Sequence, residues 1–217
     1  SGEYNLEVYY SRLKQVLQEV AEHKEIYGRF DTVHIVGLGD GVDGYGGSTY
    51  RGIKTGSHQL PQNLDNKEQF KTYVESMVFF IQEIYKMDMC NKLHFITVGE
   101  SNHGADLEAI SNQSLKYITE IKYSKEVFEF TLFQQAINHF NYGDSTFIIT
   151  HGKDNEQMNK GLPLHINDRT DNYLGDYIRH NKIKSKNVYL LKGDLHQYGQ
   201  SIGKNITRYI SVGSLYG

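Results

Sequence analysis

The sequence has little cysteine and proline, no tryptophan and no long hydrophobic run. With one cysteine among 217 residues, Cys90, the chain can form no internal disulfide, which is typical of proteins in a reducing cytosol. No apolar run reaches the roughly 18 residues that a membrane-spanning helix needs, so we expect no membrane partner. The first residues, Ser1 to Tyr4, lack the basic and apolar regions of a signal peptide, and a cytoplasmic protein is therefore expected.

An excess of positive charge is missing as well. The chain carries 23 Lys and Arg against 26 Asp and Glu, a formal net charge of −3, so any contact with nucleic acid must be local. Hydrophobic residues make up 38% of the chain and aromatic residues 12%, which is enough for a substantial core. Because we find no repeat, low-complexity tract or linker, residues 1–217 are expected to form one domain.

The apolar periodicity predicts an α/β fold with mixed sheets, in which helices alternate with short strands. Helical spacing marks residues 5–27, 66–89, 105–122 and 171–181, and a short helix is expected at 133–139. Short β-branched and apolar runs mark strands at 31–38, 93–98, 127–132, 146–150, 188–191 and 207–212. The glycine-rich stretch 39–65 predicts a long loop, and loops of this length are often functional.

Four of the predicted strands are each followed by a cluster of polar residues. The clusters contain Asp40 and Asp43, Asn102 and His103, His151, and Asp194 and His196. In open α/β sheets, ligands bind at the carboxyl ends of strands, so we expect these side chains to converge on one place. Asp194 and His196 flank a single leucine, and in an extended segment they would face the same side.

Asp, Asn and His together are ligands for Mn²⁺, Fe²⁺, Zn²⁺ or Mg²⁺ rather than for metals that require thiolates. Two such ions about 3.5–4 Å apart can hold an attacking water and a phosphoryl oxygen together. A nearby histidine that binds no metal can protonate the leaving oxygen. The clusters therefore predict a metal-dependent reaction at a phosphoester.

The cluster after the first strand also permits a different interpretation, because residues 39–44 spell Gly-x-Gly-x-x-Gly. A dinucleotide-binding fingerprint needs a helix to open at once, and the continuation Tyr45-Gly46-Gly47-Ser48 is a poor helix start. Asp40 would also repel a diphosphate. A nucleotide-binding oxidoreductase is therefore the least favoured of the functions considered.

Taken singly, each polar cluster could also be an ordinary turn, and it is their joint occurrence at strand ends that favours a site. Other histidines have simpler interpretations. His34 and His94 lie inside predicted strands and are expected to be packing residues, whereas His58, in the glycine-rich loop, could contact a substrate. Cys90 follows a helix end and is expected to be a buried apolar group rather than a nucleophile.

The order Gly-Asp-x-x-Asp, Asn-His, His-Gly and Gly-x-x-His resembles the calcineurin-like metallophosphoesterases. This superfamily includes protein phosphatases, cyclic-nucleotide phosphodiesterases and the nuclease subunits of double-strand-break repair complexes. The motifs run from Asp40 to His196. Residues 60–63 (LPQN), 151–154 (HGKD) and 192–197 (KGDLHQ) are most similar to a repair-exonuclease-like branch common in bacteriophage genomes. The resemblance implies two mixed sheets sandwiched together and flanked by helices, and the host cytoplasm as the location if a phage encodes the protein.

The resemblance also implies roles for single residues. Asp40 would bridge two divalent ions, Asn102 and His151 would bind the second ion, and His196 the first. His103 would be the general acid, and the attacking group would be a metal-bound hydroxide. The ions would be Mn²⁺ in the first instance, with Mg²⁺, Fe²⁺ and Zn²⁺ open, and the substrate a phosphoester for which DNA is one candidate.

The sequence departs from the family pattern in three places. The family opens with Asp-x-His on a strand ahead of a helix like 5–27, so we expect that strand to be missing here and this chain to hydrolyse little. The usual Gly-Asn-His-Asp is Ser101-Asn102-His103-Gly104, which lacks the aspartate. Asp194 replaces the first histidine of Gly-His-x-His. It can still bind Mn²⁺ or Mg²⁺ and would favour harder ions. Asp43 would orient the loop rather than bind metal.

Two functions from different classes therefore stay open. The first is a metal-dependent phosphoesterase with a two-metal site, which the phage resemblance makes a phosphodiesterase or nuclease rather than a monoesterase. The second is a non-catalytic module that binds nucleic acid or protein and keeps the fold with an incomplete metal site.

Overall fold

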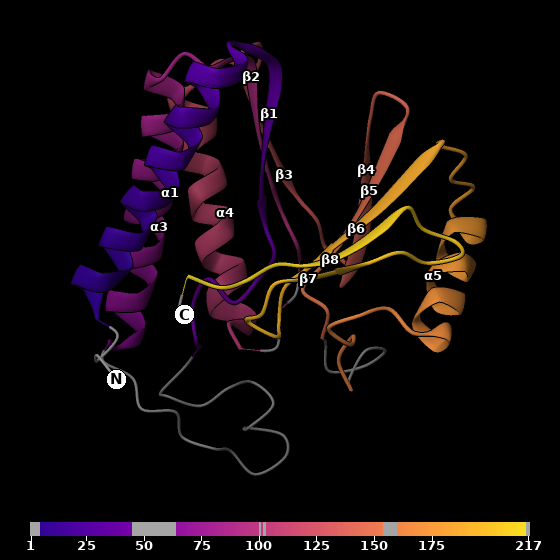
Figure 1. Cartoon of the computed structure of the whole chain (residues 1–217). Coiled ribbons are helices and arrows are strands. Elements are labelled where there is room, and N and C mark those ends of the chain that lie inside the picture. Colours follow the sequence, from indigo (N-terminus) through magenta and orange to yellow (C-terminus); the bar gives the residue numbers. More distant parts are fainter. Residues whose placement is uncertain (1–4, 45–63, 100, 102, 154–159, 216–217) are drawn as a thin grey trace.

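The computed structural model describes residues 5–44, 64–99, 101, 103–153 and 160–215. In these residues the chain forms two β-sheets flanked by helices, so the predicted α/β fold with two sheets is confirmed. In Figure 1 the two sheets face each other, with α1, α3 and α4 against one of them and α5 against the other. The helices are α1 (Leu6–Tyr27), α3 (Asn66–Lys86), α4 (Ala105–Lys122) and α5 (Asp168–His180).

The first sheet has three parallel strands in the order β1-β2-β3. These strands are β1 (Phe30–Gly37), β2 (Cys90–Thr97) and β3 (Phe128–Leu132). Helices join them in the usual crossover connection of parallel strands. All three strands therefore end at the same edge of the sheet.

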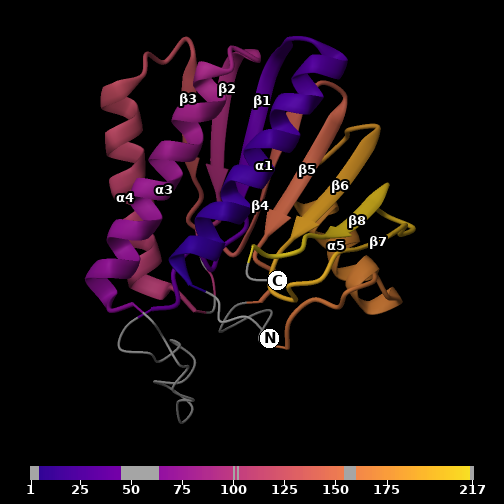
Figure 2. The ribbon, with the colours of Figure 1, turned by 60° about the vertical axis from the view of Figure 1, so that its left-hand side comes forward.

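The second sheet has five strands in the order β4-β5-β6-β8-β7. Strands β5, β6 and β8 are parallel, and the outer strands β4 and β7 pair antiparallel with their neighbours. The bounds are β4 (Ile137–Tyr142), β5 (Ser145–Thr150), β6 (Asn187–Lys192), β7 (Gly199–Ser201) and β8 (Arg208–Ser211). Figure 2 shows this sheet beside the first, with α5 on its outer face.

The core has separate layers between these elements. Leu13, Ile81 and Phe95 belong to the cluster between the helices and the first sheet, and Ile96 and Ile149 meet between the two sheets. A further cluster joins the second sheet to α5. Each fully buried aliphatic side chain contributes about 1.5–3 kcal/mol relative to an exposed one. The inter-sheet layer fixes how the carboxyl ends of β1 and β2 face those of β5 and β6.

Local signals explain where the long helices begin. Asn5 caps α1 by accepting a hydrogen bond from the Val8 amide, and Asp65 and Glu68 form a reciprocal capping box at α3. Helix α4 is different, because its N-cap is Gly104 and no side chain caps it. The start of α4 instead lies among the polar loops described below.

The helix predicted at 133–139 is wrong. Residues 137–142 form β4, which turns back into β5 through the two-residue loop Gly143-Asp144, where Gly143 has a φ of 58°. Glycine adopts this conformation without the steric cost that other residues carry, and the hairpin pairing outweighs the weak helical pattern. The short strand β7 was also not predicted. The helix predicted at 66–89 ends at Lys86, and β2 begins at Cys90.

None of the helices in the described ranges has an apolar stretch long enough to cross a bilayer.

Candidate functional site

The carboxyl ends of β1, β2, β5 and β6 come together where the two sheets meet. Four residues, one from each following loop, meet there: the Asp40 and Asp194 carboxylates lie within 4.0 Å of the His151 ring, and the backbone N–H of His103 donates to Asp40. The loops approach so closely that a Cβ on Gly39 would lie 2.9 Å from His151 Nδ1 and from Ser101 Cβ. The convergence predicted from the four strand ends is therefore present for these four residues.

Asp40 and His151 form the centre of the site. His151 Nε2 lies 3.2 Å from Asp40 Oδ2, and the His151 side chain is only 3% exposed. The other ring nitrogen, Nδ1, lies 2.8 Å from the carbonyl oxygen of Leu38. Because a carbonyl can only accept, Nδ1 carries a proton and Nε2 is the nitrogen presented to the carboxylates.

The two groups shift each other's pKa. Burial alone would lower the pKa of His151, but the hydrogen bond and charge of Asp40, the Leu38 carbonyl and the charge of Asp194 raise it. Burial would likewise raise the pKa of Asp40, and His151, His103 and Ser101 outweigh it and hold that pKa below its usual value. Each group therefore favours the charged form of the other.

His103 is held beside this pair by two contacts. Its backbone N–H donates to Asp40 Oδ1 at 3.2 Å, and its ring Nδ1 lies 2.6 Å from Asp43 Oδ1. The Asp43 amide donates to Gln69 of α3, which anchors the loop. Burial lowers the pKa of His103, but the hydrogen bond that its ring donates to Asp43 and the charge of Asp40 raise it above its ordinary value. Asp43 thus orients a histidine whose side chain is 30% exposed.

Asp194 closes the site on the side of the second sheet. Its Oδ1 lies 4.0 Å from His151 Nε2 and 4.0 Å from Lys153 Nζ, and its side chain is 10% exposed. Lys192, at the end of β6, is completely buried, and burial lowers its pKa to about 8. The lysines partly offset the two carboxylates that face His151.

The segment around Asp194 is not extended, so the strand periodicity that would place Asp194 and His196 on the same side does not apply here. Asp194 and His196 have φ values of 70° and 55°, in the left-handed region. As a result Asp194 is turned toward His151, while His196 is exposed. Asp40 has a φ of 54°, so two of the converging carboxylates sit on backbone that non-glycine residues rarely adopt. Such outliers occur often at functional sites.

The other predicted site residues have different outcomes. Asn102 and His58 lie outside the described residues, and their roles stay predictions. His34 and His94 pack between the sheets as expected, with ring centroids 5.2 Å apart. Cys90 is half-buried, and burial raises the pKa of its thiol, in keeping with a structural role.

Glu108 contacts the loops of the site and was not found from the sequence. It lies in the first turn of α4, where an acidic residue is ordinary, and only its tertiary contacts distinguish it.

The donors at this edge fit a divalent cation in their chemistry. Asp40, Asp194 and the Nε2 atom of His151 are ligands that Mn²⁺, Fe²⁺ and Zn²⁺ accept, and the Leu38 carbonyl fixes the tautomer that a metal ligand needs. Within the part of the chain that the structure describes, no three carboxylate, imidazole or thiolate groups already stand in coordinating positions. To hold an ion, Asp40 and His151 would exchange their mutual contact for contacts with it.

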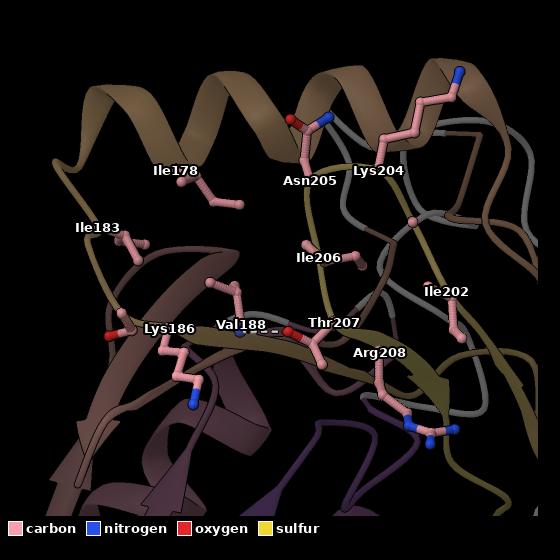
Figure 3. A pocket seen from close by; sticks show the side chains of 12 residues that line it. Ile178, Ile183, Lys186, Val188, Ile202, Lys204, Asn205, Ile206, Thr207 and Arg208 are labelled. Carbon is pink, nitrogen blue, oxygen red and sulfur yellow. Dashed lines mark hydrogen bonds between the residues drawn. The ribbon is translucent and has the colours of Figure 1, made fainter.

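A separate hollow of about 560 Å³ lies between α5 and the strands β6 and β8. Figure 3 shows Ile178, Ile183 and Ile206 inside it, with Lys186 and Arg208 on the strand side. Its described lining contains no Asp or Glu. The described lining therefore offers no carboxylate ligand for a hard cation.

The chain matches no protein-family model, and no curated protein and no solved structure matches it. The fold and site therefore define this protein only as an α/β protein of two sheets with a carboxylate–histidine cluster at their common edge.

Proposed function

We propose that this protein is a metal-dependent phosphoesterase that acts on phosphodiesters, with its active site at the common edge of the two sheets. The observation that carries the proposal is the meeting of Asp40, His151 and Asp194, with the imidazole tautomer set by Leu38. The Asp40 and Asp194 carboxylates both lie within 4.0 Å of His151 Nε2, carboxylate and imidazole are donors that Mn²⁺ accepts, and Asn102 is a further proposed ligand. The diester preference derives from the resemblance described above.

Each described residue then has a definite task. A divalent ion bound here would supply charge that stabilises a phosphoryl oxygen and lowers the pKa of water. Asp40, His151 and Asp194 would hold the ion, and His196 would serve the other metal position. His103 contacts Asp40 through its backbone N–H, and its ring contacts Asp43 instead. The imidazole would therefore hold no metal and could give a proton to the leaving oxygen. Asp43 keeps that ring in place.

The test is a Mn²⁺ titration of the chain by calorimetry, followed by hydrolysis of bis-p-nitrophenyl phosphate and p-nitrophenyl phosphate. We expect Mn²⁺ to bind, and the diester to be cleaved slowly but faster than the monoester, in a reaction that a chelator abolishes. The matched control is His139→Ala. His139 lies on β4, and its ring is hydrogen-bonded to the Tyr177 hydroxyl rather than to any proposed ligand. This variant should bind Mn²⁺ as the parent does.

Absence of Mn²⁺, Mg²⁺, Fe²⁺ and Zn²⁺ binding would overturn the proposal. Metal binding without hydrolysis of either ester would favour the alternative, a binding module that keeps the fold. A faster monoesterase reaction would contradict the diester preference alone.

A further inference from the structure

Glu108 is a buried carboxyl group that joins two loops of the candidate site. It is 6% exposed, and its Oε1 accepts a hydrogen bond from the Gly41 amide at 2.8 Å. Its Oε2 is hydrogen-bonded to the hydroxyl of Ser101, which in turn is hydrogen-bonded to Asp40. One side chain of α4 thus contacts the backbone next to Asp40 and, through Ser101, the Asp40 carboxylate itself.

The space that Glu108 fills is left open by Gly104. A Cβ on Gly104 would lie 2.5 Å from Glu108 Cβ and 2.9 Å from Glu108 Oε2. A side chain at residue 104 would therefore collide with the Glu108 side chain, and the Val42 carbonyl oxygen, 3.0 Å from the same Cβ, confines the space further. Gly104 has a φ of −69° and a ψ of −31°, which any residue adopts, so the glycine is required by this contact rather than by its backbone.

The protons of the network can be counted. The Ser101 hydroxyl has one proton and lies between two carboxyl groups, so it can donate to only one of them. With Glu108 ionised, the Ser101 hydroxyl donates to Glu108 Oε2, whereas with Glu108 protonated the carboxyl group donates to the Ser101 oxygen, Ser101 donates to Asp40, and all partners are satisfied. Burial raises the pKa of Glu108, which favours this arrangement. Glutamine would reproduce it, because its amide NH₂ donates and its oxygen accepts.

We propose that Glu108 is the positioning residue of this site, which holds the Asp40 carboxylate through Ser101 and the following backbone through Gly41. It supplies a carboxyl group from α4 in the space beside residue 104. The expected effect of Glu108 on Mn²⁺ affinity rests on the proposed function. Its expected effect on the order of the loops in the metal-free protein does not.

The first experiment compares Mn²⁺ affinity by calorimetry for the parent chain, Glu108→Ala and Glu108→Gln. We expect Glu108→Ala to lose about 10–100-fold in affinity, the usual loss when a residue that orients a ligand is removed. Glu108→Gln should stay close to the parent. Thr119→Ala is the control, because Thr119 is buried on the same helix and bonds only to backbone carbonyls of α4.

The second experiment exchanges the two positions. Gly104→Asp alone should weaken Mn²⁺ binding, because the new Cβ collides with Glu108. Combined with Glu108→Gly, which removes the Glu108 Cβ as well as the carboxyl group, the same substitution should lose less affinity than the sum of the two single losses. Strict additivity of the two losses would contradict a shared space.

A third readout needs no metal. Amide hydrogen exchange should become faster at Gly41 and at His103 in Glu108→Ala, because Gly41 donates to Glu108 and His103 donates to Asp40. Unchanged exchange at His103, or equal effects of the Ala and Gln variants, would overturn the proposal. If the parent binds no divalent ion, the proposed function fails, and exchange still decides the role of Glu108. Ser101→Ala gives the same test should Glu108→Ala not fold.

Discussion

The protein has two pairs of histidines near its two sheets, one pair at the strand ends beside carboxylates and one pair packed between the sheets. His103 and His151, at the carboxyl ends of the strands, each contact a carboxylate, and their pKa values are raised. His34 and His94, inside β1 and β2, have lowered pKa values, chiefly because burial penalises the charged form. Both ring nitrogens of His34 are buried and lack a hydrogen-bond partner among the described residues. The neighbours, and not the residue type, decide which histidine can do proton or metal chemistry.

The largest expected effect is a loss of turnover on changing His103, one of the two histidines at the strand ends. His103→Ala should lower turnover of the diester substrate by about 10²–10⁴-fold, the usual contribution of a general acid, because it removes the proton donor. Mn²⁺ affinity should change little, since the ring contacts Asp43 rather than the proposed ligands. Steady-state kinetics and calorimetry on the same sample separate the two quantities. Equal turnover of variant and parent would remove His103 from this role.

A loss of metal affinity comes next. Asp40→Asn keeps the side-chain shape and tolerates the φ of 54°, but it removes the charge that faces His151. We expect Mn²⁺ affinity to fall by at least about 100-fold, the upper range for residues that only orient a ligand. Asn138→Ala, on β4, is a control that should leave affinity unchanged. A titration indistinguishable from that of the parent would mean that Asp40 holds no ion.

The inner pair should affect stability and not binding. His34→Phe places a ring of similar size against Phe140 and Tyr142 and removes two unpaired nitrogens. The free energy of unfolding should rise by about 1–2 kcal/mol at pH 7, as for other buried polar groups without partners. Urea unfolding followed by circular dichroism measures it. A destabilised variant would show that His34 has a polar partner in the folded chain.

The same variant should change the response to acid. Because the folded pKa of His34 and of His94 lies below the ordinary 6.5, the unfolded chain binds more protons in the window below that value. Their contribution to stability is therefore present above pH 6.5 and is lost as the pH falls. His34→Phe should make the stability curve flatter between pH 6.5 and the lowered pKa. A curve as steep as that of the parent would assign the acid sensitivity to other groups.

The smallest effect concerns Glu108. Its pKa is raised in the folded state, so the native chain holds this proton more tightly and stability falls as the pH rises from 4.5 through the folded pKa. Glu108→Gln cannot ionise and should lose this slope. If the melting temperatures of parent and variant changed equally with pH across that range, the raised pKa of Glu108 would be contradicted.

Much of the fold follows from the sequence because its signals are local. The apolar spacing of 105–122 predicts α4 with its observed bounds, and the β-branched run at 31–38 predicts β1 to within a residue. The strand β4 could not be found in this way, because its pairing with β5 decides its structure. A better signal for this hairpin is the Gly143-Asp144 pair, which is typical of a two-residue turn between two strands.

The site was predictable in part for a similar reason. Asp40, His103, His151 and Asp194 each follow a strand, and parallel strands bring their carboxyl ends to one edge. Glu108 has no such signal, because its role depends on contacts with loops 67 and seven residues away in the chain. The local backbone at Asp194 and His196 was not predictable, because both residues adopt left-handed φ values that break the strand periodicity.

The close approach of Gly39 to His151 has a consequence for how the protein unfolds. Asp40 belongs to the first sheet and His151 and Asp194 to the second, so a ligand held by all three would fasten the sheets together at this edge. Binding to the folded state alone adds about 2.7 kcal/mol when the ligand is at 100 times its dissociation constant. Both sheets should then unfold together at a higher melting temperature. A thermal scan would therefore report whether the site is occupied before any substrate is known.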